Sequence, residues 1–228
     1  MELYWIEWYS NDMSRAVKGV AAKRSYDSTK RQAQARSTRA AIRDAATLLF
    51  LDRGYAATTI QAIADEAGVA PQTVYAAFKT KFAVLKEALE VSIVGDDEPI
   101  PLMERDDILS IYAEPDQHER ARMQARAIRE IQQRAAPMSL VARDAAAADP
   151  EVAAFWALGK EQRRMGMAEA ARGLAGDDGL RIPVDEAADV LWVIFSPDVF
   201  MQFTRDKGWS VERYEAWVRD TLERTMLP

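Results

Sequence analysis

Apolar positions recur along the first part of the chain with the period of an α-helix. From Ser37 onward they fall at i, i+3, i+4, i+7 and i+8, namely at Ile42, Ala45, Ala46, Leu49 and Phe50. This spacing places them on one face of a helix. The pattern stops at Arg53 and Gly54, where glycine can adopt the left-handed conformation that ends helices. We therefore predict a first amphipathic helix from Ser37 to Gly54.

Two short helical segments follow. The stretch ATTIQAIADEAG has Thr58 or Thr59 as its N-cap, because a threonine hydroxyl accepts a hydrogen bond from the first helical turn. Gly68 ends this segment, and its apolar stripe consists of Ile60, Ile63, Ala64 and Ala67. In the next stretch, VAPQTVYAAFK, Val74 and Phe78 stand at i and i+4. We expect this pair to face inward and to anchor a third helix.

The rest of the chain also has helical patterns. Thr80 caps a fourth helix that ends at Gly95, with apolar positions at Phe82, Leu85, Leu89 and Ile93. Residues 96–115 are rich in proline and acidic side chains, which predicts a linker or an ordered loop. Further helices are expected at about 116–134, 137–148, 150–174, 184–206 and 211–226. No alternating β-branched run interrupts them, so the predicted fold class is all-α.

The helix predicted at 184–195 is apolar almost all round after Asp189, so it must be covered on more than one side. The last helix carries a broad apolar stripe and ends the chain. We expect both helices to pair with their symmetry mates in a four-helix dimer interface. The alternative is that they bury each other within one subunit. The candidate interface residues are Leu191, Trp192, Phe195, Phe200, Tyr214, Trp217, Val218 and Leu222. Pro197 should break the first of the two helices, with Ser196 capping its continuation.

Charge is divided unevenly along the 228 residues. The chain has a net charge of −6, but residues 1–89 hold 13 basic and 9 acidic residues, a net +4. The remaining residues hold 17 basic and 27 acidic residues, a net −10. The N-terminal part can therefore meet a polyanion, whereas the C-terminal part should not.

Composition narrows the functional classes further. The chain has no cysteine and one histidine, which excludes disulfides and thiolate metal sites and leaves few groups for acid–base catalysis near neutral pH. The first residues lack the features of a signal peptide, and no apolar run reaches about 18 residues, so we expect no membrane span. We expect a cytoplasmic protein without a cofactor.

Residues 1–35 are interpreted as a partly disordered N-terminal extension. Residues 15–36 hold seven basic side chains against Asp27 alone among acidic residues. Two interpretations stay open for this stretch. It is either a solvated tail or a basic arm that follows phosphates or a minor groove.

The two short helices joined at AGVA predict a helix-turn-helix, with Gly68 supplying the turn. The second helix of such a unit lies in the major groove of DNA. Gln72 can pair with adenine, and Thr73 and Ala76 can pack on a thymine methyl group. The short side chains let the helix backbone approach the base edges.

Phosphate contacts are expected at the edges of the same helix. Tyr75 can donate its hydroxyl to a phosphate, and Lys79 and Lys81 are placed for two more. Such contacts fix the register of a protein on DNA rather than its sequence preference. The domain boundaries predicted from these patterns are 36–82 for the helix-turn-helix domain and 83–228 for a larger helical domain.

Residues 36–89 resemble the DNA-binding domain of the TetR (AcrR-type) family of transcriptional regulators. The resemblance rests on the run LLF…GY..TT…IA..AGV, a Thr-hydrophobic-Tyr trio with an aromatic residue soon after, and a lysine opening the next helix. It implies phosphate contacts by Thr59, Tyr75 and Lys81, and base contacts by Gln61, Gln72 and Thr73. Many members have glycine at the position of Gln72, so base preference does not carry over. The full set of candidate DNA-binding residues is Arg39, Thr58, Thr59, Gln61, Pro71, Gln72, Thr73, Tyr75, Lys79 and Lys81.

The resemblance also implies that the C-terminal domain binds a small ligand and dimerises. Candidate lining residues for an apolar cavity are Met103, Tyr112, Met123, Phe155, Trp156, Met165 and Met167. The alternative is that these aromatic and methionine side chains are plain core. We expect His118 to be a surface residue, and the acidic pairs at Asp106 and Asp177 to be solvated loops rather than metal sites.

These patterns predict a dimeric, ligand-responsive transcriptional regulator, most simply a repressor, that binds a palindromic operator and is released by a small apolar effector. One alternative is an enzyme acting on a small hydrophobic substrate, although the chain has no G-x-G-x-x-G, G-x-S-x-G, H-E-x-x-H or P-loop motif. Another is an architectural DNA-binding protein without a ligand, which would need no cavity in its C-terminal domain.

Overall fold

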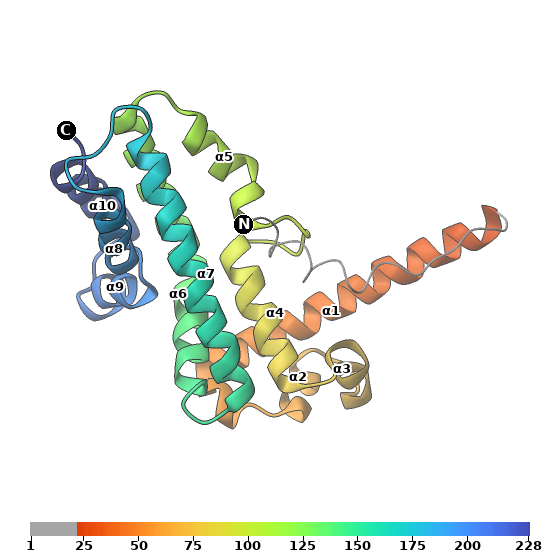
Figure 1. Cartoon of the computed structure of the whole chain (residues 1–228). Coiled ribbons are helices and arrows are strands. Elements are labelled where there is room, and N and C mark those ends of the chain that lie inside the picture. Colours follow the sequence, from red (N-terminus) through yellow and green to blue (C-terminus); the bar gives the residue numbers. More distant parts are fainter. Residues whose placement is uncertain (1–21) are drawn as a thin grey trace. The chain divides into compact units, whose positions relative to one another are not determined.

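Helices form the regular structure of residues 22–228, which the computed structural model describes, with side chains from residue 30 on. They are α1 (Ala22–Ala57), α2 (Ile60–Glu66), α3 (Pro71–Phe78), α4 (Lys81–Val94), η1 (Leu102–Glu104), α5 (Asp106–Ala113), α6 (Gln117–Ala145), α7 (Pro150–Ala175), α8 (Val184–Ile194), α9 (Pro197–Met201), η2 (Gln202–Asp206) and α10 (Val211–Thr225) (Figure 1). No strand occurs within 22–228, which confirms the predicted all-α class. By its contacts the chain divides into two units, residues 1–41 and 42–228, which are described separately.

The described part of the first unit is helical from Ala22, where α1 begins. The sequence pattern predicts a start at Ser37, so the helix begins earlier than expected. Residues 22–41 contain no glycine or proline and are rich in alanine, arginine, lysine and glutamine, all strong helix formers, so nothing in this stretch stops the helix. Of the N-terminal extension predicted at residues 1–35, residues 22–35 belong to α1, and residues 1–21 lie outside the described residues.

In the second unit, the part of α1 from Ile42 on packs with α2, α3 and α4 around one apolar cluster. The predicted inner face of α1 is buried at all five positions, Ile42, Ala45, Ala46, Leu49 and Phe50. The predicted break is also confirmed, because Gly54 interrupts the helix with φ 77° and ψ 168°. This backbone region is open almost only to glycine.

Threonine hydroxyls begin the second and fourth helices. The Thr59 hydroxyl accepts a hydrogen bond from the Ala62 amide at 3.1 Å, which decides between the two N-caps considered for α2. The Thr80 hydroxyl accepts from the Ala83 amide at 3.0 Å and caps α4. Gly68 has φ 66° and makes the turn between α2 and α3. The local signals of this region therefore fold as predicted.

Residues 96–115 are more ordered than the predicted linker or loop. They contain η1 and the two-turn helix α5, in which Ile108 and Ile111 are buried. Acidic side chains at Asp106 and Asp107 occupy the first turn of α5, where they interact favourably with the helix dipole. Because proline and acidic residues dominate this stretch, the sequence pattern does not indicate the short apolar face of α5.

Helix α6 continues through a proline, whereas the sequence pattern predicts two helices with a break near residue 135. Pro137 lies inside α6, where it removes one backbone hydrogen bond. Ala135, Ala136, Met138 and Ser139 flank it and are buried. Packing on both sides of the proline holds the helix together, because the side chains that surround it belong to the core.

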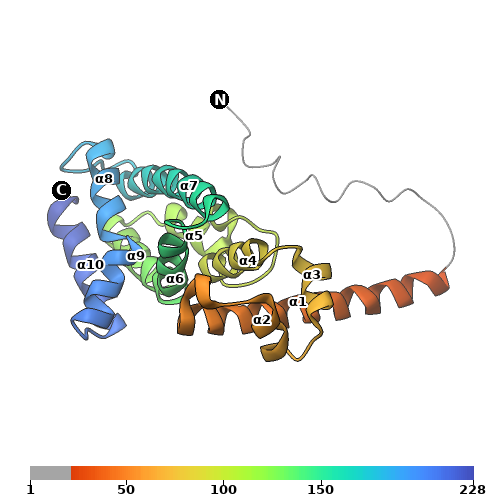
Figure 2. The ribbon, with the colours of Figure 1, turned by 90° about the horizontal axis from the view of Figure 1, so that it is seen from below.

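A second apolar cluster joins α6 and α7 to α8, α9 and α10. Within it, the Tyr214 hydroxyl donates to the Ile194 carbonyl at 3.0 Å, and the Gln132 amide donates to the Phe195 carbonyl at 2.6 Å. The predicted break after α8 is confirmed, because the Ser196 hydroxyl caps α9. Figures 1 and 2 place α10 and α8 at the opposite end of this unit from α2 and α3.

This second cluster changes the picture of the predicted dimer interface. Six of the eight candidates are buried inside one chain, namely Leu191, Phe195, Phe200, Tyr214, Val218 and Leu222. Trp192 and Trp217 are half-buried. Helix α10 packs on α6, a partner that periodicity within α8 and α10 could not indicate. For these six residues the structure follows the alternative of burial within one subunit.

No helix of residues 22–228 is both long enough and apolar enough to cross a membrane.

Candidate nucleic-acid interface

Helix α3 is held to the core by two of its side chains. Val74 and Phe78 are 0% and 3% exposed, as their spacing predicts. The helix begins at Pro71, which occupies the first position after the N-cap Ala70, where a missing amide hydrogen does no harm. With its inner face fixed at two points a turn apart, α3 presents its opposite face to solvent.

The outer face of α3 carries an amide, a phenol, a methyl group and an ammonium group. Gln72, Tyr75, Ala76 and Lys79 are all exposed, and Tyr75 keeps 54% of its surface. They fall at i, i+3, i+4 and i+7, so they form one stripe along the helix. Thr73 lies beside this stripe and is half-buried. The arrangement offers donors for base edges and phosphates, with no carboxylate among these residues.

Lys79 ends α3 in a strained backbone conformation. Its φ is 61° and its ψ is −47°, and the Thr80 amide donates to the Phe78 carbonyl at 2.6 Å across it. This is a γ-turn of the rarer hand, which is disfavoured for a residue with a side chain. The turn lets Thr80 begin α4 at once and leaves the Lys79 side chain exposed at the end of the stripe.

The start of α2 brings two further candidates to the surface. Thr59 and Gln61 are exposed, and Thr59 already caps the helix. The Gln61 amide donates to an Asp65 carboxylate oxygen at 2.7 Å. Gln61 therefore has a partner one turn along, which a base would have to replace.

Thr58 is buried, whereas a residue that contacts DNA is expected at the surface. It is 1% exposed, and its hydroxyl donates to the Gly54 carbonyl at 2.8 Å and lies 3.3 Å from the Leu49 carbonyl. The Gly54 carbonyl belongs to the end of α1, where helical partners run out. The hydroxyl supplies the missing donor inside the fold.

Lys81 is also engaged within the fold. Its ammonium donates to the Tyr55 carbonyl at 2.8 Å and to the Thr58 carbonyl at 2.9 Å, and it lies 4.1 Å from the centre of the Tyr55 ring. Burial lowers the pKa of Lys81, and the charge of Asp149 opposes that shift. The position of Lys81 at the start of a helix beside a DNA-binding motif predicts a phosphate contact. The sequence does not indicate that the carbonyls of Tyr55 and Thr58 accept from its ammonium group.

The remaining DNA-binding candidates are Arg39 and Pro71. Arg39 belongs to the first unit, in the part of α1 before residue 42, and is half-buried. Pro71 is half-buried at the start of α3, where its role is to begin the helix. Of the ten candidates, the structure brings Gln72, Tyr75 and Lys79 together on one exposed stripe.

The seven candidates for a ligand cavity do not gather at one place. Phe155 and Trp156 pack against the first apolar cluster, and Met167 packs against the second. Met165 is 38% exposed on α7. The Tyr112 ring lies so close to Gly173 that a Cβ atom there would come within 2.2 Å of it. Met103 and Met123 are half-buried on η1 and α6.

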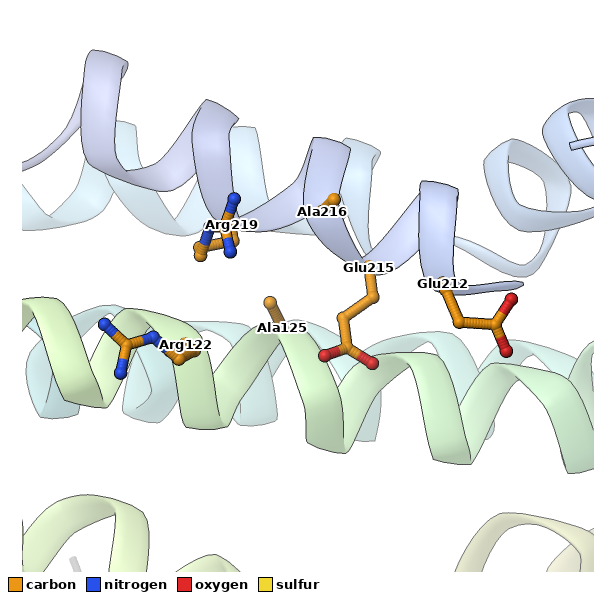
Figure 3. A pocket seen from close by; sticks show the side chains of 6 residues that line it. All are labelled: Arg122, Ala125, Glu212, Glu215, Ala216 and Arg219. Carbon is orange, nitrogen blue, oxygen red and sulfur yellow. The ribbon is translucent and has the colours of Figure 1, made fainter. Parts of the chain in front are cut away.

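Two pockets are found on α10, and none of the seven candidates lines either. One has a volume of about 230 Å³ and lies between α6 and α10. Figure 3 shows Arg122 and Arg219 at one end of it and Glu212 at the other. The second has a volume of about 460 Å³ and is lined by Trp209 and Trp217 together with polar side chains of α10. Among the side chains that the structure describes, those of residues 30–228, no group of three potential metal ligands occurs.

Comparison with known proteins gives a family match over the part of the chain that includes the exposed stripe. Residues 42–88 match a family described as bacterial regulatory proteins, tetR family. This range covers α1 from Ile42 through most of α4. No curated protein matches the chain in sequence.

Solved structures share the fold over most of the chain. A proposed transcriptional regulator from Saccharomonospora viridis, in complex with choline, is 20% identical with a TM-score of 0.64, covering 84% of this chain and 98% of its own. A transcriptional regulator from Aquifex aeolicus is 13% identical with a TM-score of 0.59, covering 82% and 98%. NalD of Pseudomonas aeruginosa, the secondary repressor of a multidrug efflux pump, is 21% identical with a TM-score of 0.54, covering 84% and 97%.

Proposed function

Because the chain belongs to the TetR family of transcriptional regulators, we propose that it represses transcription by placing α3 in the major groove of an operator. The observation that carries this proposal is the exposed stripe of α3, anchored from behind by Val74 and Phe78. A helix fixed on its inner face presents its outer side chains at one defined angle, which base recognition requires.

The side chains of the stripe divide into two roles. Gln72 reads a base edge, since its amide can donate and accept together. Tyr75 and Lys79 bind phosphates and fix the register of α3 on the duplex. Ala76 keeps the helix close to the bases because its side chain is a single methyl group. Lys81 acts indirectly, because its ammonium is engaged with two carbonyls.

We further propose that the active form is a homodimer, so that two copies of α3 bind a palindromic site. Since six of the sequence candidates are buried within one chain, the interface falls to the outer faces of α8 and α10. Val193 is 56% exposed on α8, and Trp209 and Trp217 line the second pocket, which lies on α10. Large apolar side chains of this kind favour a protein contact when they are covered by a partner.

A matched pair of variants tests the dimer. Val193→Glu changes the proposed interface, whereas Leu158→Glu changes an aliphatic side chain of similar exposure, 51%, on α7. Sedimentation of both variants should show monomers for Val193→Glu and dimers for Leu158→Glu. If both variants sediment as dimers, α8 is not part of the interface.

Binding of DNA is tested by selecting duplexes from a random-sequence library with the purified protein. We expect the selected sequences to share a palindrome with half-sites one helical turn apart or a multiple of it. Enrichment without a shared sequence would favour the architectural alternative. No enrichment at all would refute DNA binding by α3.

Control by a small molecule completes the proposal, and the choline complex of the Saccharomonospora viridis protein supports it. The C-terminal domain would release DNA when it binds an effector, because the effector and DNA favour different states of the dimer. Choline and its uncharged carbon isostere, dimethylbutanol, are suitable first probes. An uncharged apolar effector site predicts that the isostere weakens binding to the selected duplex more than choline does.

A further inference from the structure

Three side chains from three helices meet at the end of α1. Tyr55 comes from α1, Lys81 is the first residue of α4, and Asp149 is the N-cap of α7. The Tyr55 hydroxyl donates to an Asp149 carboxylate oxygen at 3.1 Å. These residues are 94 positions apart in the chain, so the bond ties the helix-turn-helix region to the C-terminal domain.

Asp149 uses its two carboxylate oxygens for different purposes. Oδ1 accepts from the Glu151 amide at 3.0 Å and from the Val152 amide at 3.3 Å, which caps α7. Oδ2 accepts from Tyr55. One rigid carboxylate therefore links the first turn of α7 to the end of α1, and a shift of that turn moves the acceptor of Tyr55.

Tyr55 is held as a neutral donor. It is 8% exposed, and burial, followed by the charge of Asp149, raises its pKa. Its ring packs on Phe50 with centroids 5.7 Å apart and carries the Lys81 ammonium on its face. Because the ring is buried and in contact with both Phe50 and Lys81, the Tyr55 hydroxyl has little room to follow Asp149 elsewhere.

The backbone of Tyr55 leads directly to α2. Its carbonyl accepts from Lys81 at 2.8 Å and from the Thr58 amide at 3.3 Å. Thr59 follows as the N-cap of α2, and α2 packs on α3. A displacement at Tyr55 therefore reaches the recognition helix through one turn of chain and one helix contact.

We propose that Asp149 is a positioning residue for DNA binding, which through Tyr55 and Lys81 sets where the helix-turn-helix stands relative to the first turn of α7. The DNA part of this inference rests on the proposed function. The joint gives the first turn of α7 a polar connection to the end of α1, and through it to α2 and α3, in addition to the packing of α4 on α6 and α7.

Three substitutions separate the joint from the helix cap. Tyr55→Phe removes the hydroxyl and keeps the ring under Lys81. Asp149→Ser keeps an N-cap oxygen but is too short to reach Tyr55. Asp149→Asn keeps the cap oxygen, and its NH2 group can donate to the Tyr55 hydroxyl oxygen, so the bond is kept with its direction reversed and the variant should rescue. Asp116→Ser is the matched control, because Asp116 caps α6 in the same way, accepting from the amides of residues 118 and 119.

The readouts are affinity for the selected duplex and hydrogen exchange of residues 60–78. Tyr55→Phe and Asp149→Ser should each weaken duplex binding by roughly 5- to 10-fold, the lower end of couplings between sites in proteins. The double variant should bind no more weakly than the weaker single variant, since both changes break one bond. Exchange of residues 60–78 should quicken in both variants, and in neither Asp149→Asn nor Asp116→Ser.

The two readouts distinguish the joint from the proposed function. If the wild-type protein selects no duplex, the proposed function fails, while faster exchange in Tyr55→Phe and Asp149→Ser still supports the joint. Unchanged exchange of residues 60–78 in both variants overturns the joint, even if their melting temperatures fall. Effects of Tyr55→Phe and Asp149→Ser that add in the double variant also overturn it, because the two residues would then act separately.

Discussion

The helix-turn-helix region and the C-terminal helices use their apolar side chains in contrasting ways. In α3, two buried residues hold the helix, and three exposed residues face outward together with Lys79 at the C-cap. In α10, Tyr214, Val218 and Leu222 are buried against the rest of the same chain, and the outer face is a mixture of tryptophan and charged residues. The first region exposes a mostly polar stripe, whereas the second buries most of its apolar surface within one subunit.

This difference shows what an apolar helix face reveals about its partner. A short helix with two anchors has one inner face, so its outer residues are known once the anchors are known. A helix with a broad apolar stripe needs cover, but the stripe does not say whether the cover comes from the same chain or from a second copy. For α10, the packing against α6 shows that the cover comes from the same chain.

The largest expected effect comes from truncating the core of the C-terminal domain. Tyr214→Ala should lower the free energy of unfolding by about 3–5 kcal/mol, as for other large aromatic truncations in cores. Tyr214 is 0% exposed and its hydroxyl is bonded to Ile194. Urea denaturation measures the change, with Leu158→Ala, at a position that is 51% exposed on α7, as a control that should stay within about 0.5 kcal/mol.

A different result would reverse the assignment of α10. If Tyr214→Ala left unfolding unchanged and weakened only self-association, the inner face of α10 would be a subunit interface. The contrast between the two regions would then disappear.

A smaller effect is expected from Thr58→Val, which keeps the shape of the side chain and removes its hydroxyl. The loss should be about 1–3 kcal/mol of unfolding free energy, because the Gly54 carbonyl at the end of α1 loses its donor. Thr47→Val is a matched control, since the Thr47 hydroxyl donates to the Arg43 carbonyl at 2.9 Å within a helix.

The same variant distinguishes a structural threonine from a DNA contact. We expect Thr58→Val to leave the salt dependence of duplex binding unchanged, because a buried hydroxyl meets no phosphate. A lower slope of log K against log salt would place Thr58 at the DNA after all.

The smallest effect on stability is expected at Lys79. Lys79→Gly should raise the free energy of unfolding by up to about 1 kcal/mol, since glycine relieves the positive φ but adds freedom to the unfolded chain. The same change should weaken DNA binding and lower the salt slope by about 0.9 per phosphate contact, hence about 1.8 for a dimer. Lys79→Asn, which tolerates positive φ, checks that the slope follows charge. A lower free energy of unfolding in Lys79→Gly would contradict the inference that the backbone of Lys79 is strained.

The features set by neighbouring residues could be predicted from the sequence. The helix boundaries around Gly54, Thr59 and Gly68, and the anchors Val74 and Phe78, depend on contacts a few positions apart. Glycine turns, threonine caps and helical spacing determine them almost alone. The exposed stripe of α3 follows from the same local rules.

The features set by distant residues could not be predicted. Asp149 meets Tyr55 across 94 positions, and nothing in the spacing of either residue indicates the other. Lys81 has a local pattern typical of a phosphate contact, but the carbonyls that engage it come from the end of another helix. Pro137 predicts a helix break on local grounds, and burial of its neighbours overrides that preference. In each of these places, tertiary packing decides.

The central claim, that the outer stripe of α3 reads DNA, is tested most directly by Gln72→Ala across a salt titration. We predict a loss of about 1–3 kcal/mol for each base contact on the selected duplex, with binding to random duplex and the salt slope unchanged. Gln162→Ala, an exposed glutamine on α7, should alter none of these quantities. If Gln72→Ala bound the selected and random duplexes with the same preference as the wild-type protein, α3 would not be reading bases through Gln72 and the account would be contradicted.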